Sequence, residues 1–548
     1  MTQNKSKKQN FLHGAAILTL GVIIMKILGA IYKIPLGNIL QPEGYALFIS
    51  SYSIYNIFFT LATAGLPVAL SRLIAEADAN GRGNQEVKTF KVALGTFSVI
   101  GIIFSTVMFF CADWLAENYL ELPAAALSIK AMSPAILMVC IVSAYRGFCQ
   151  GNGNMIPTTV DEVLEVLFKV ISGLILAVVV LKATNDLAKG SAAAILGVSI
   201  GGLVSLAFMI IYKRINYDKL SAGYTSGIAE GDIIEDNYEV DSAGKIVKDI
   251  LTIGIPIALG ASIMAILNSI DPKLCMNRLV KGAGMSHESA KYLYGCYGEV
   301  QTLFNLPAAL TQPLNISVVP AIAGALAVGR KSVSEKVSED SLRITAVVAL
   351  PMGLGLACLS TPIVALMFKD NEAGGEILRI MGFASFFVCM VLMENAILQA
   401  SGKERLPMYS MISGSFVKII VNYFLIADPD INIVGAPVGT LCGYVWMAAM
   451  NFFFIRKTLG LKIRIEKILL KPVICSAAMG AAALIVYAMM SKVLDTSVWI
   501  FLAVSTVAAI GAAVIVYLVL IIAVKTITME DMKLIPGGEK IGKLLHIH

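Results

Sequence analysis

The stretch QGNGNMIPTTVDEVLEVLFK (residues 150–169) has a counterpart, QASGKERLPMYSMISGSFVK (residues 399–418), that begins 249 residues later. In both copies a Gln opens a short polar turn, a Pro follows, and a Lys stands 19 residues after the Gln inside an apolar run. Upstream, GLPVAL (residues 65–70) is echoed by NLPAAL (residues 305–310). The repetition predicts a membrane protein built from two homologous halves, which is typical of transporters.

Composition places the chain in a membrane. Of its 548 residues 57% are hydrophobic and only 15% are charged, and the mean hydropathy is +0.78. Soluble domains have about 25% charged residues. Apolar runs of about 20 residues, each long enough to cross a bilayer, recur along the chain. Lysines and arginines fall between these runs and form no basic face, so we expect no nucleic-acid partner.

Motifs for catalysis or metal binding are missing from the sequence. Nine Cys lie mostly in apolar runs without a CxxC pair, and four His form no cluster. Neither a P-loop nor HExxH occurs. We therefore expect neither a metal, nor a cofactor, nor an enzyme.

The apolar runs predict an all-α integral membrane protein with fourteen transmembrane helices. They form two six-helix lobes and two additional C-terminal helices. The predicted spans are 11–35, 45–71, 90–112, 125–149, 157–181, 190–212, 248–270, 294–328, 343–368, 376–400, 407–427, 432–455, 472–491 and 497–524.

Four regions follow from this pattern. We predict an N-lobe at 1–216, a polar cytoplasmic linker at 217–247, a C-lobe at 248–458, and the last two spans with a cytoplasmic tail at 459–548. Because six spans is an even number, both lobes should enter the membrane in the same direction. The lobes are therefore predicted to be parallel repeats related by an axis along the membrane normal.

Charge in the connections predicts the orientation. Lysines and arginines are concentrated in the connections that lie on the same side as the N-terminus, and 456–471 is the most basic of them. Cytoplasmic connections carry this excess. We expect a multi-pass plasma-membrane protein with both termini in the cytoplasm, working as a monomer.

Three lysines lie deep in apolar runs. Lys26 is too far inside the first span to reach the headgroups, and Lys169 and Lys418 occupy the matching positions of the repeat. A charge at such depth costs about 2.5–3.5 kcal/mol on insertion scales, so it is a functional-site hypothesis. We expect these lysines to face an aqueous cavity and to hold an anionic substrate.

Other polar residues accompany the lysines. Glu165 precedes Lys169 by one helical turn, which predicts an i,i+4 pair, while Glu394 is the candidate carboxylate for Lys418. Arg146, like Arg72, ends a span and is predicted to be an edge anchor that can also meet a headgroup. The predicted substrate-binding residues of the central cavity are Lys26, Arg72, Glu165, Lys169, Glu394, Lys418 and Asn422.

Three motifs resemble a known family: LGAIYKIP (residues 28–35), AGLPVA (residues 64–69) and YRGFCQG (residues 145–151). They look like the polysaccharide-transporter branch of the multidrug/oligosaccharidyl-lipid/polysaccharide (MOP) flippase superfamily. Within it, the chain is most similar to stage V sporulation protein B-like and lipid II flippase-like proteins. The resemblance covers essentially the whole chain, including the six, six and two spans.

The resemblance implies a flippase that carries an undecaprenyl-pyrophosphate-linked saccharide, such as lipid II or a related glycan, to the outer leaflet by alternating access. Its implied partners are this lipid-linked oligosaccharide, membrane lipids and, as a further option, cell-wall synthesis enzymes. Lys26 falls where similar flippases carry a basic residue. Thr302 is a departure, because those flippases have an arginine there.

Two other functions stay open. A multidrug/cation antiporter of the same fold would use intramembrane carboxylates, for which Glu162 and Glu394 are candidates. A non-transporting membrane scaffold for cell-wall enzymes would need no matched lysines, so the repeat argues against it.

Overall fold

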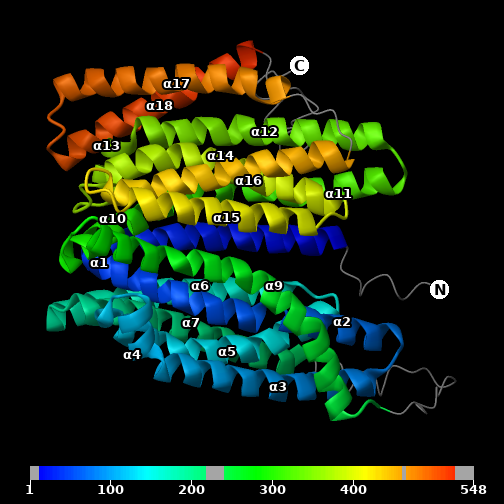
Figure 1. Ribbon diagram of the computed structural model, residues 1–548. Helices are drawn as coiled ribbons and strands as arrows, with labels where there is room; N and C mark the ends of the chain where they lie inside the picture. Colours follow the sequence, from blue (N-terminus) through cyan, green and yellow to red (C-terminus); the bar gives the residue numbers. More distant parts are fainter. Residues whose placement is uncertain (1–10, 217–239, 460–464, 525–548) are drawn as a thin grey trace. The chain divides into compact units, whose positions relative to one another are not determined.

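The computed structural model describes residues 11–216, 240–459 and 465–524, and every regular element in these ranges is a helix (Figure 1). Contacts divide the chain into two compact units, unit 1 (Met1–Lys273) and unit 2 (Leu274–His548). Most of the predicted linker at 217–247, and both ends of the chain, lie outside the described residues. The expected lobe boundaries therefore stay a prediction.

Unit 1 contains the first six long helices and most of a seventh, which continues into unit 2. The short turns α4 (Ala112–Trp114), η1 (Leu115–Tyr119) and η2 (Pro123–Ala125) connect α3 to α5. The long helices are α1 (Phe11–Thr63), α2 (Leu66–Ala79), α3 (Gly83–Phe110), α5 (Ala126–Gly151), α6 (Ile156–Thr184), α7 (Leu187–Asn216) and α9 (Ala243–Asn277).

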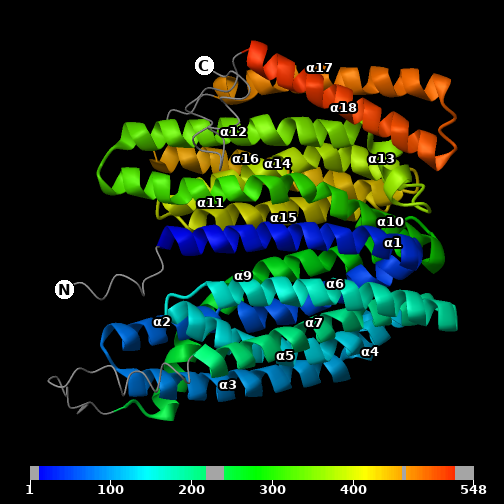
Figure 2. The same ribbon diagram turned by 180° about the vertical axis from the view of Figure 1, so that it is seen from behind.

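Unit 2 repeats the pattern of long helices and short connections and ends in an additional pair. This pair, α17 and α18, packs against α12 and α13 (Figure 2). The helices are α10 (His287–Phe304), α11 (Leu306–Ala327), α12 (Lys331–Cys358), α13 (Ser360–Met367), α14 (Gly374–Ala400), α15 (Arg405–Leu425), α16 (Gly435–Leu459), α17 (Ile465–Val493) and α18 (Trp499–Ala523).

Helix α1 joins two of the predicted spans, 11–35 and 45–71. The helix continues through the expected connection and bends at Gln41, whose φ of 58° and ψ of 166° lie outside the helical region. Pro42 follows directly. Because proline lacks a backbone N–H and disfavours helical geometry in the residue before it, the bend is localised at this pair.

Proline also marks where two predicted spans divide. Within the predicted span 45–71, α1 ends at Thr63 and α2 begins at Leu66–Pro67. The predicted span 294–328 is divided into α10 and α11, and α11 begins at Leu306–Pro307. Proline fits the first turn of a helix, whose N–H groups have no intrahelical acceptor. The LP motif of the sequence repeat is thus a helix restart in both units.

Twelve helices among the described residues are long and apolar enough to cross a membrane. One of the twelve is the bent segment Ile24–Ala79, and α10 and α11 are not among them. The multi-pass all-helical fold is confirmed, whereas the count of fourteen spans is not.

The repeated turn has the same geometry in both units. Gly153 and Gly402 have φ near 70°, and the N–H of each donates to the carbonyl of the Gln three residues earlier at 2.9 Å. Glycine enters this left-handed region without steric cost. The glycine in each turn therefore sets where α6 and α15 begin.

Helices α6 and α7 form a tight hairpin. Only two residues connect them, and Asn185 (φ 50°) closes the turn. A Cβ built on Gly201 of α7 would lie 2.4 Å from the Glu165 carbonyl of α6, and one on Gly197 would lie 2.7 Å from Gly173. Glycine at these positions lets the two backbones touch.

Candidate functional site

Three lysines gather inside unit 1. Lys26 and Lys33 are seven residues apart on α1, and Lys169 comes from α6. Lys33 is close enough to both for their charges to repel its ammonium group directly. Lys169 also lies over the ring of Tyr52, 6.0 Å from the centroid. We call Lys26, Lys33 and Lys169 the lysine cluster.

Packing of α1 against the α6–α7 hairpin brings the cluster together. The hydroxyl of Tyr32 donates to the Ala194 carbonyl of α7 at 3.1 Å. Gly173 of α6 leaves the space for this ring, since a Cβ there would lie 2.7 Å from the Tyr32 hydroxyl. Lys33 is next to Tyr32 in sequence, so this contact places it near Lys169.

None of the three lysines forms an ion pair with a carboxylate in the part of the chain that the structure describes. The acidic residues of α6, Asp161, Glu162 and Glu165, form ion pairs with Arg146 instead. Its guanidinium contacts Asp161 at 2.5 Å, Glu165 at 2.8 Å and Glu162 at 3.9 Å. The Ser205 hydroxyl of α7 also donates to Asp161.

The i,i+4 spacing predicted that Glu165 pairs with Lys169. This prediction is wrong, because Glu165 pairs with Arg146. Arg146 is 8% exposed and lies in this buried network, so it is not the edge anchor that its position in the sequence suggested. A buried guanidinium that meets two carboxylates at hydrogen-bond distance is compensated. Because these carboxylates pair with Arg146, they do not neutralise the positive charge of the lysine cluster.

In unit 2, Lys418 is half-buried on α15. Its Cβ would lie 3.1 Å from a Cβ built on Gly443 of α16, and its carbonyl lies beside Gly439. These contacts match those of Lys169 with Gly201 and Gly197. The two repeat lysines thus occupy equivalent places in their own units.

A second polar network links α14, α15 and α16. Asn451 donates to the Asn395 side chain at 2.8 Å and accepts from the Ser410 hydroxyl at 2.6 Å. Asn451 also hydrogen-bonds to Glu394. Glu394 is 2% exposed, and its Oε2 has no hydrogen-bond partner among the described residues. Its polar partner is thus an amide, not Lys418.

The remaining predicted residues lie apart from these groups. Asn422 is fully buried on α15, and neither amide atom has a hydrogen-bond partner within the described ranges. Arg72 is exposed on α2. Thr302, at the position where similar flippases carry arginine, is buried on α10.

Sequence reasoning missed two members of these groups. Lys33 is not among the residues predicted for the cavity, although its spacing of seven from Lys26 places both on one helical face. Asp161 was not considered, although it precedes Glu165 by one turn. Across the residues that the structure describes, no group of three His, Cys, Asp or Glu side chains could hold a metal ion.

Comparisons with protein families give two matches. The family described as "Polysaccharide biosynthesis protein" matches residues 11–326, and the MatE family matches residues 295–424.

Individual proteins resemble the chain over nearly its whole length. Lipid II flippase MurJ of Bacillus subtilis is 27% identical over 528 residues, covering 92% of this chain and 94% of that protein. Stage V sporulation protein B of the same bacterium is 24% identical over 545 residues, with coverages of 98% and 99%.

Solved structures share the fold. The inward closed conformation of lipid II flippase MurJ has a TM-score of 0.65 at 15% identity, covering 93% of this chain and 100% of that one. An inward-facing MATE family transporter of the MOP superfamily has a TM-score of 0.62 at 16% identity, with coverages of 81% and 98%.

Proposed function

Because the chain belongs to the polysaccharide biosynthesis protein family, we propose that it is a flippase for an undecaprenyl-pyrophosphate-linked saccharide, lipid II or a related glycan. It moves this lipid from the inner to the outer leaflet of the plasma membrane. The resemblance to the MOP superfamily is confirmed by these matches, and the family and its structural neighbours are transporters and flippases, not enzymes.

The lysine cluster is the observation that carries the proposal. The charges of Lys26 and Lys169 both act on Lys33, and no described carboxylate forms an ion pair with any of the three. An anion bound among them relieves this repulsion, and each contact is strengthened where water is sparse. A diphosphate offers two adjacent anionic groups, which suits several lysines better than a single carboxylate would.

Transport then requires that the site release its ligand on the far side. In alternating access the affinity for the headgroup is lower in the outward-open state, because a conformational change follows only from differential binding. The lipid tail stays in the bilayer while the sugars cross in water. Lys418, at the repeat position of Lys169, is the proposed cation of unit 2.

The remaining expectations complete the proposal. The lobes are parallel repeats, both termini face the cytoplasm, and the protein works as a monomer with membrane lipids and cell-wall synthesis enzymes as neighbours. The excess of Lys and Arg in the connections on one side supports the orientation. Labelling of single cysteines introduced into the 456–471 connection by a membrane-impermeant reagent tests it, and labelling in intact cells would contradict it.

A second candidate is a MATE-type multidrug/cation antiporter. Two observations favour it: the MatE match to residues 295–424, and the buried Glu394 with an oxygen that lacks a hydrogen-bond partner among the described residues. Glu394→Gln should abolish transport if this carboxylate binds the coupling ion, and should leave lipid transport intact if the protein is the proposed flippase.

Complementation of a bacterium depleted of its own lipid II flippase tests the proposal. We expect rescue by wild type and loss of rescue with Lys26→Ala and Lys33→Ala. Lys182→Ala, which removes an exposed lysine of α6, is the matched control and should rescue. Lys418→Ala should be more damaging than Lys418→Arg, because the charge is what the phosphate needs.

Two results would contradict the proposal. Full rescue by Lys26→Ala would remove this residue from the site, and tolerance of Lys418→Glu would argue against an anionic substrate. Failure of a well-expressed wild type would favour another lipid-linked glycan and then the antiporter.

A further inference from the structure

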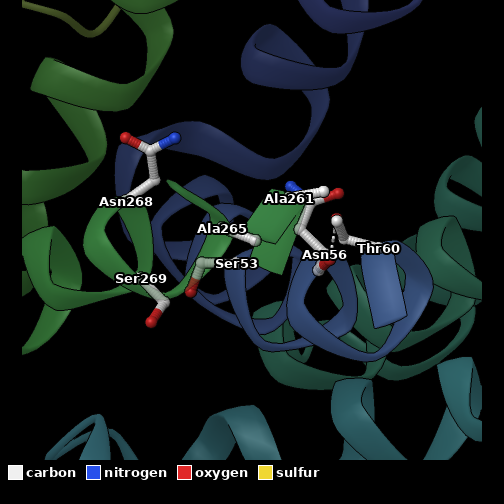
Figure 3. A pocket seen from close by; sticks show the side chains of 7 residues that line it. All are labelled: Ser53, Asn56, Thr60, Ala261, Ala265, Asn268 and Ser269. Carbon is white, nitrogen blue, oxygen red and sulfur yellow. Dashed lines mark hydrogen bonds between the residues drawn. The ribbon is translucent and has the colours of Figure 1, made fainter. Parts of the chain in front are cut away.

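A small polar pocket lies within unit 1 between α1 and α9 (Figure 3). Its volume is about 270 Å³, slightly below the range of about 300–1,000 Å³ for pockets that hold whole ligands. Figure 3 shows Asn56 and Thr60 towards one end, and Asn268 and Ser269 towards the other. The lining residues are Ser53, Asn56, Thr60, Ala261, Ala265, Asn268 and Ser269.

The side-chain amides of the two asparagines of the pocket make no hydrogen bond to any described residue. Both are exposed, and both belong to helices apolar enough to cross a membrane. An amide that faces lipid without a partner is strongly unfavourable. Asn56 and Asn268 therefore need water or a polar ligand in the pocket.

The hydroxyl groups of the pocket present acceptors. Ser53 donates to the Ser50 carbonyl, Thr60 to the Asn56 carbonyl and Ser269 to the Ile266 carbonyl, each at 2.7 Å. Because the protons of Ser53 and Thr60 are used within their own helix, their oxygen lone pairs stay available to a ligand. The Ser269 hydroxyl is buried and also lies 3.1 Å from the Tyr119 hydroxyl, so it is already paired.

The pocket contains no charged residue among those that line it. Ala261 and Ala265 are one turn apart on α9, and their small side chains leave the space open. Uncharged amides and hydroxyls with both donor and acceptor atoms match a neutral ligand that is rich in hydroxyl or amide groups. A phosphate would instead need cations.

The pocket follows Tyr52 along α1, and Tyr52 contacts one lysine of the cluster. Ser53 directly follows Tyr52, the residue whose ring lies beneath the Lys169 ammonium group at 6.0 Å. Asn56 is one turn beyond Tyr52, so the two share a face of α1. A ligand with phosphates at the cluster would place its next groups towards this pocket.

We propose that this pocket binds the sugar nearest the diphosphate of the transported lipid, through Asn56 and Asn268. The proposal rests on the function proposed above and divides the site in two: the lysine cluster holds charge, and the pocket holds uncharged hydroxyl and amide groups.

Binding of two lipids to the purified full-length protein tests this division. The probes are undecaprenyl pyrophosphate and the same lipid carrying an N-acetylated disaccharide, each titrated in detergent micelles and followed by microscale thermophoresis. We expect wild type to bind the glycosylated lipid about 10-fold more tightly, as one or two additional hydrogen bonds would give.

Two variants with different chemistry probe the pocket. Asn56→Leu/Asn268→Leu removes the amides, and Ala265→Phe fills the space. Both should lose the 10-fold preference and retain wild-type affinity for undecaprenyl pyrophosphate. Ile266→Phe, at an exposed position beside the pocket, is the matched control and should keep the preference.

The outcomes separate this proposal from the proposed function. Binding of both lipids with equal affinity by wild type, or a preference unchanged in both pocket variants, would overturn the sugar pocket alone. Binding of neither lipid by wild type would overturn the flippase proposal together with the pocket.

Discussion

Each unit links three helices through polar side chains at equivalent positions: α5, α6 and α7 in unit 1, and α14, α15 and α16 in unit 2. The link between the first two helices is ionic in unit 1 and passes through a neutral amide in unit 2. In unit 1, Arg146 of α5 forms an ion pair with Asp161 of α6 at 2.5 Å. The residues 249 positions later are Asn395 and Ser410, which are joined through the neutral amide of Asn451. A polar link between these helices therefore needs no charge, so the charges of unit 1 call for another explanation.

The difference also affects the repeat lysines. In unit 1, Arg146 pairs with Glu165, which would otherwise be available to Lys169. In unit 2, the position equivalent to Glu165 is Gly414, so α15 carries no carboxylate there. We infer that the arginine keeps neighbouring carboxylates away from the lysine cluster. The following predictions test this comparison, from the largest expected effect to the smallest.

Breaking the charged network should have the largest effect. Arg146→Asn, which introduces the residue of unit 2, leaves the buried Asp161 and the half-buried Glu165 without a cation. We expect the free energy of unfolding to fall by about 3–5 kcal/mol, measured by thermal unfolding in detergent. The same measurement on Asn395→Leu should give a smaller loss of about 1–3 kcal/mol.

Converting the whole network should restore stability. R146N/D161S/E165Q removes the charges of Arg146 and of the two carboxylates that it hydrogen-bonds. Replacing a complete buried ionic cluster often changes the free energy of unfolding little. We expect this variant to be more stable than Arg146→Asn alone. If it is less stable, the charges themselves stabilise the fold and the comparison fails.

The two repeat lysines should differ in their effect on ligand affinity. Lys169→Met removes one of three clustered cations, and we expect affinity for undecaprenyl pyrophosphate to fall about 10- to 100-fold, the equivalent of one charge-assisted hydrogen bond. Lys418→Met should have a smaller effect. If titration gives the same loss of affinity for both variants, the two lysines contribute equally to binding and the predicted difference between the units is wrong.

The glycines that pack beside the repeat lysines offer a further test. Gly201→Ala places a Cβ 2.4 Å from a backbone oxygen, whereas Gly443→Ala places it 2.9 Å from one. Overpacking costs about 1–3 kcal/mol, so both should lower the thermal unfolding temperature, Gly201→Ala more. Gly260→Ala, with open space around it, is the control and should not lower it.

Asn422 should give the smallest effect, and of opposite sign. Its buried amide has no hydrogen-bond partner within the described residues, and leucine has a similar branched shape. We expect Asn422→Leu to raise stability by about 1 kcal/mol and to retain transport, measured by unfolding and complementation. Higher stability with lost transport would instead support Asn422 as a substrate ligand.

Periodicity and repeats predicted the helical membrane fold and the family. They predicted a connection at 36–44, where α1 in fact bends at Gln41 and continues as one element. They did not predict the break at Leu306, because it lies inside one apolar run. The lysines were found because a charge in an apolar run is conspicuous in any sequence.

The partners of those charges could not be predicted in the same way. The i,i+4 rule pairs Glu165 with Lys169, since it considers one helix alone. Arg146 reaches Glu165 only after α5 packs against α6, a contact between residues 19 apart in sequence. Asn451 and Glu394 likewise meet only through the packing of α16 on α14.

The hairpin of α6 and α7 has a consequence for biosynthesis. Its two-residue turn and touching glycines allow α6 and α7 to pair as soon as both have been synthesised. Ser205 can then reach Asp161 within the hairpin, before the rest of the chain has emerged from the ribosome. A hairpin whose first helix carries Asp161, Glu162, Glu165 and Lys169 can thus leave the translocon with one of these side chains already hydrogen-bonded, instead of entering lipid with all of them unpaired.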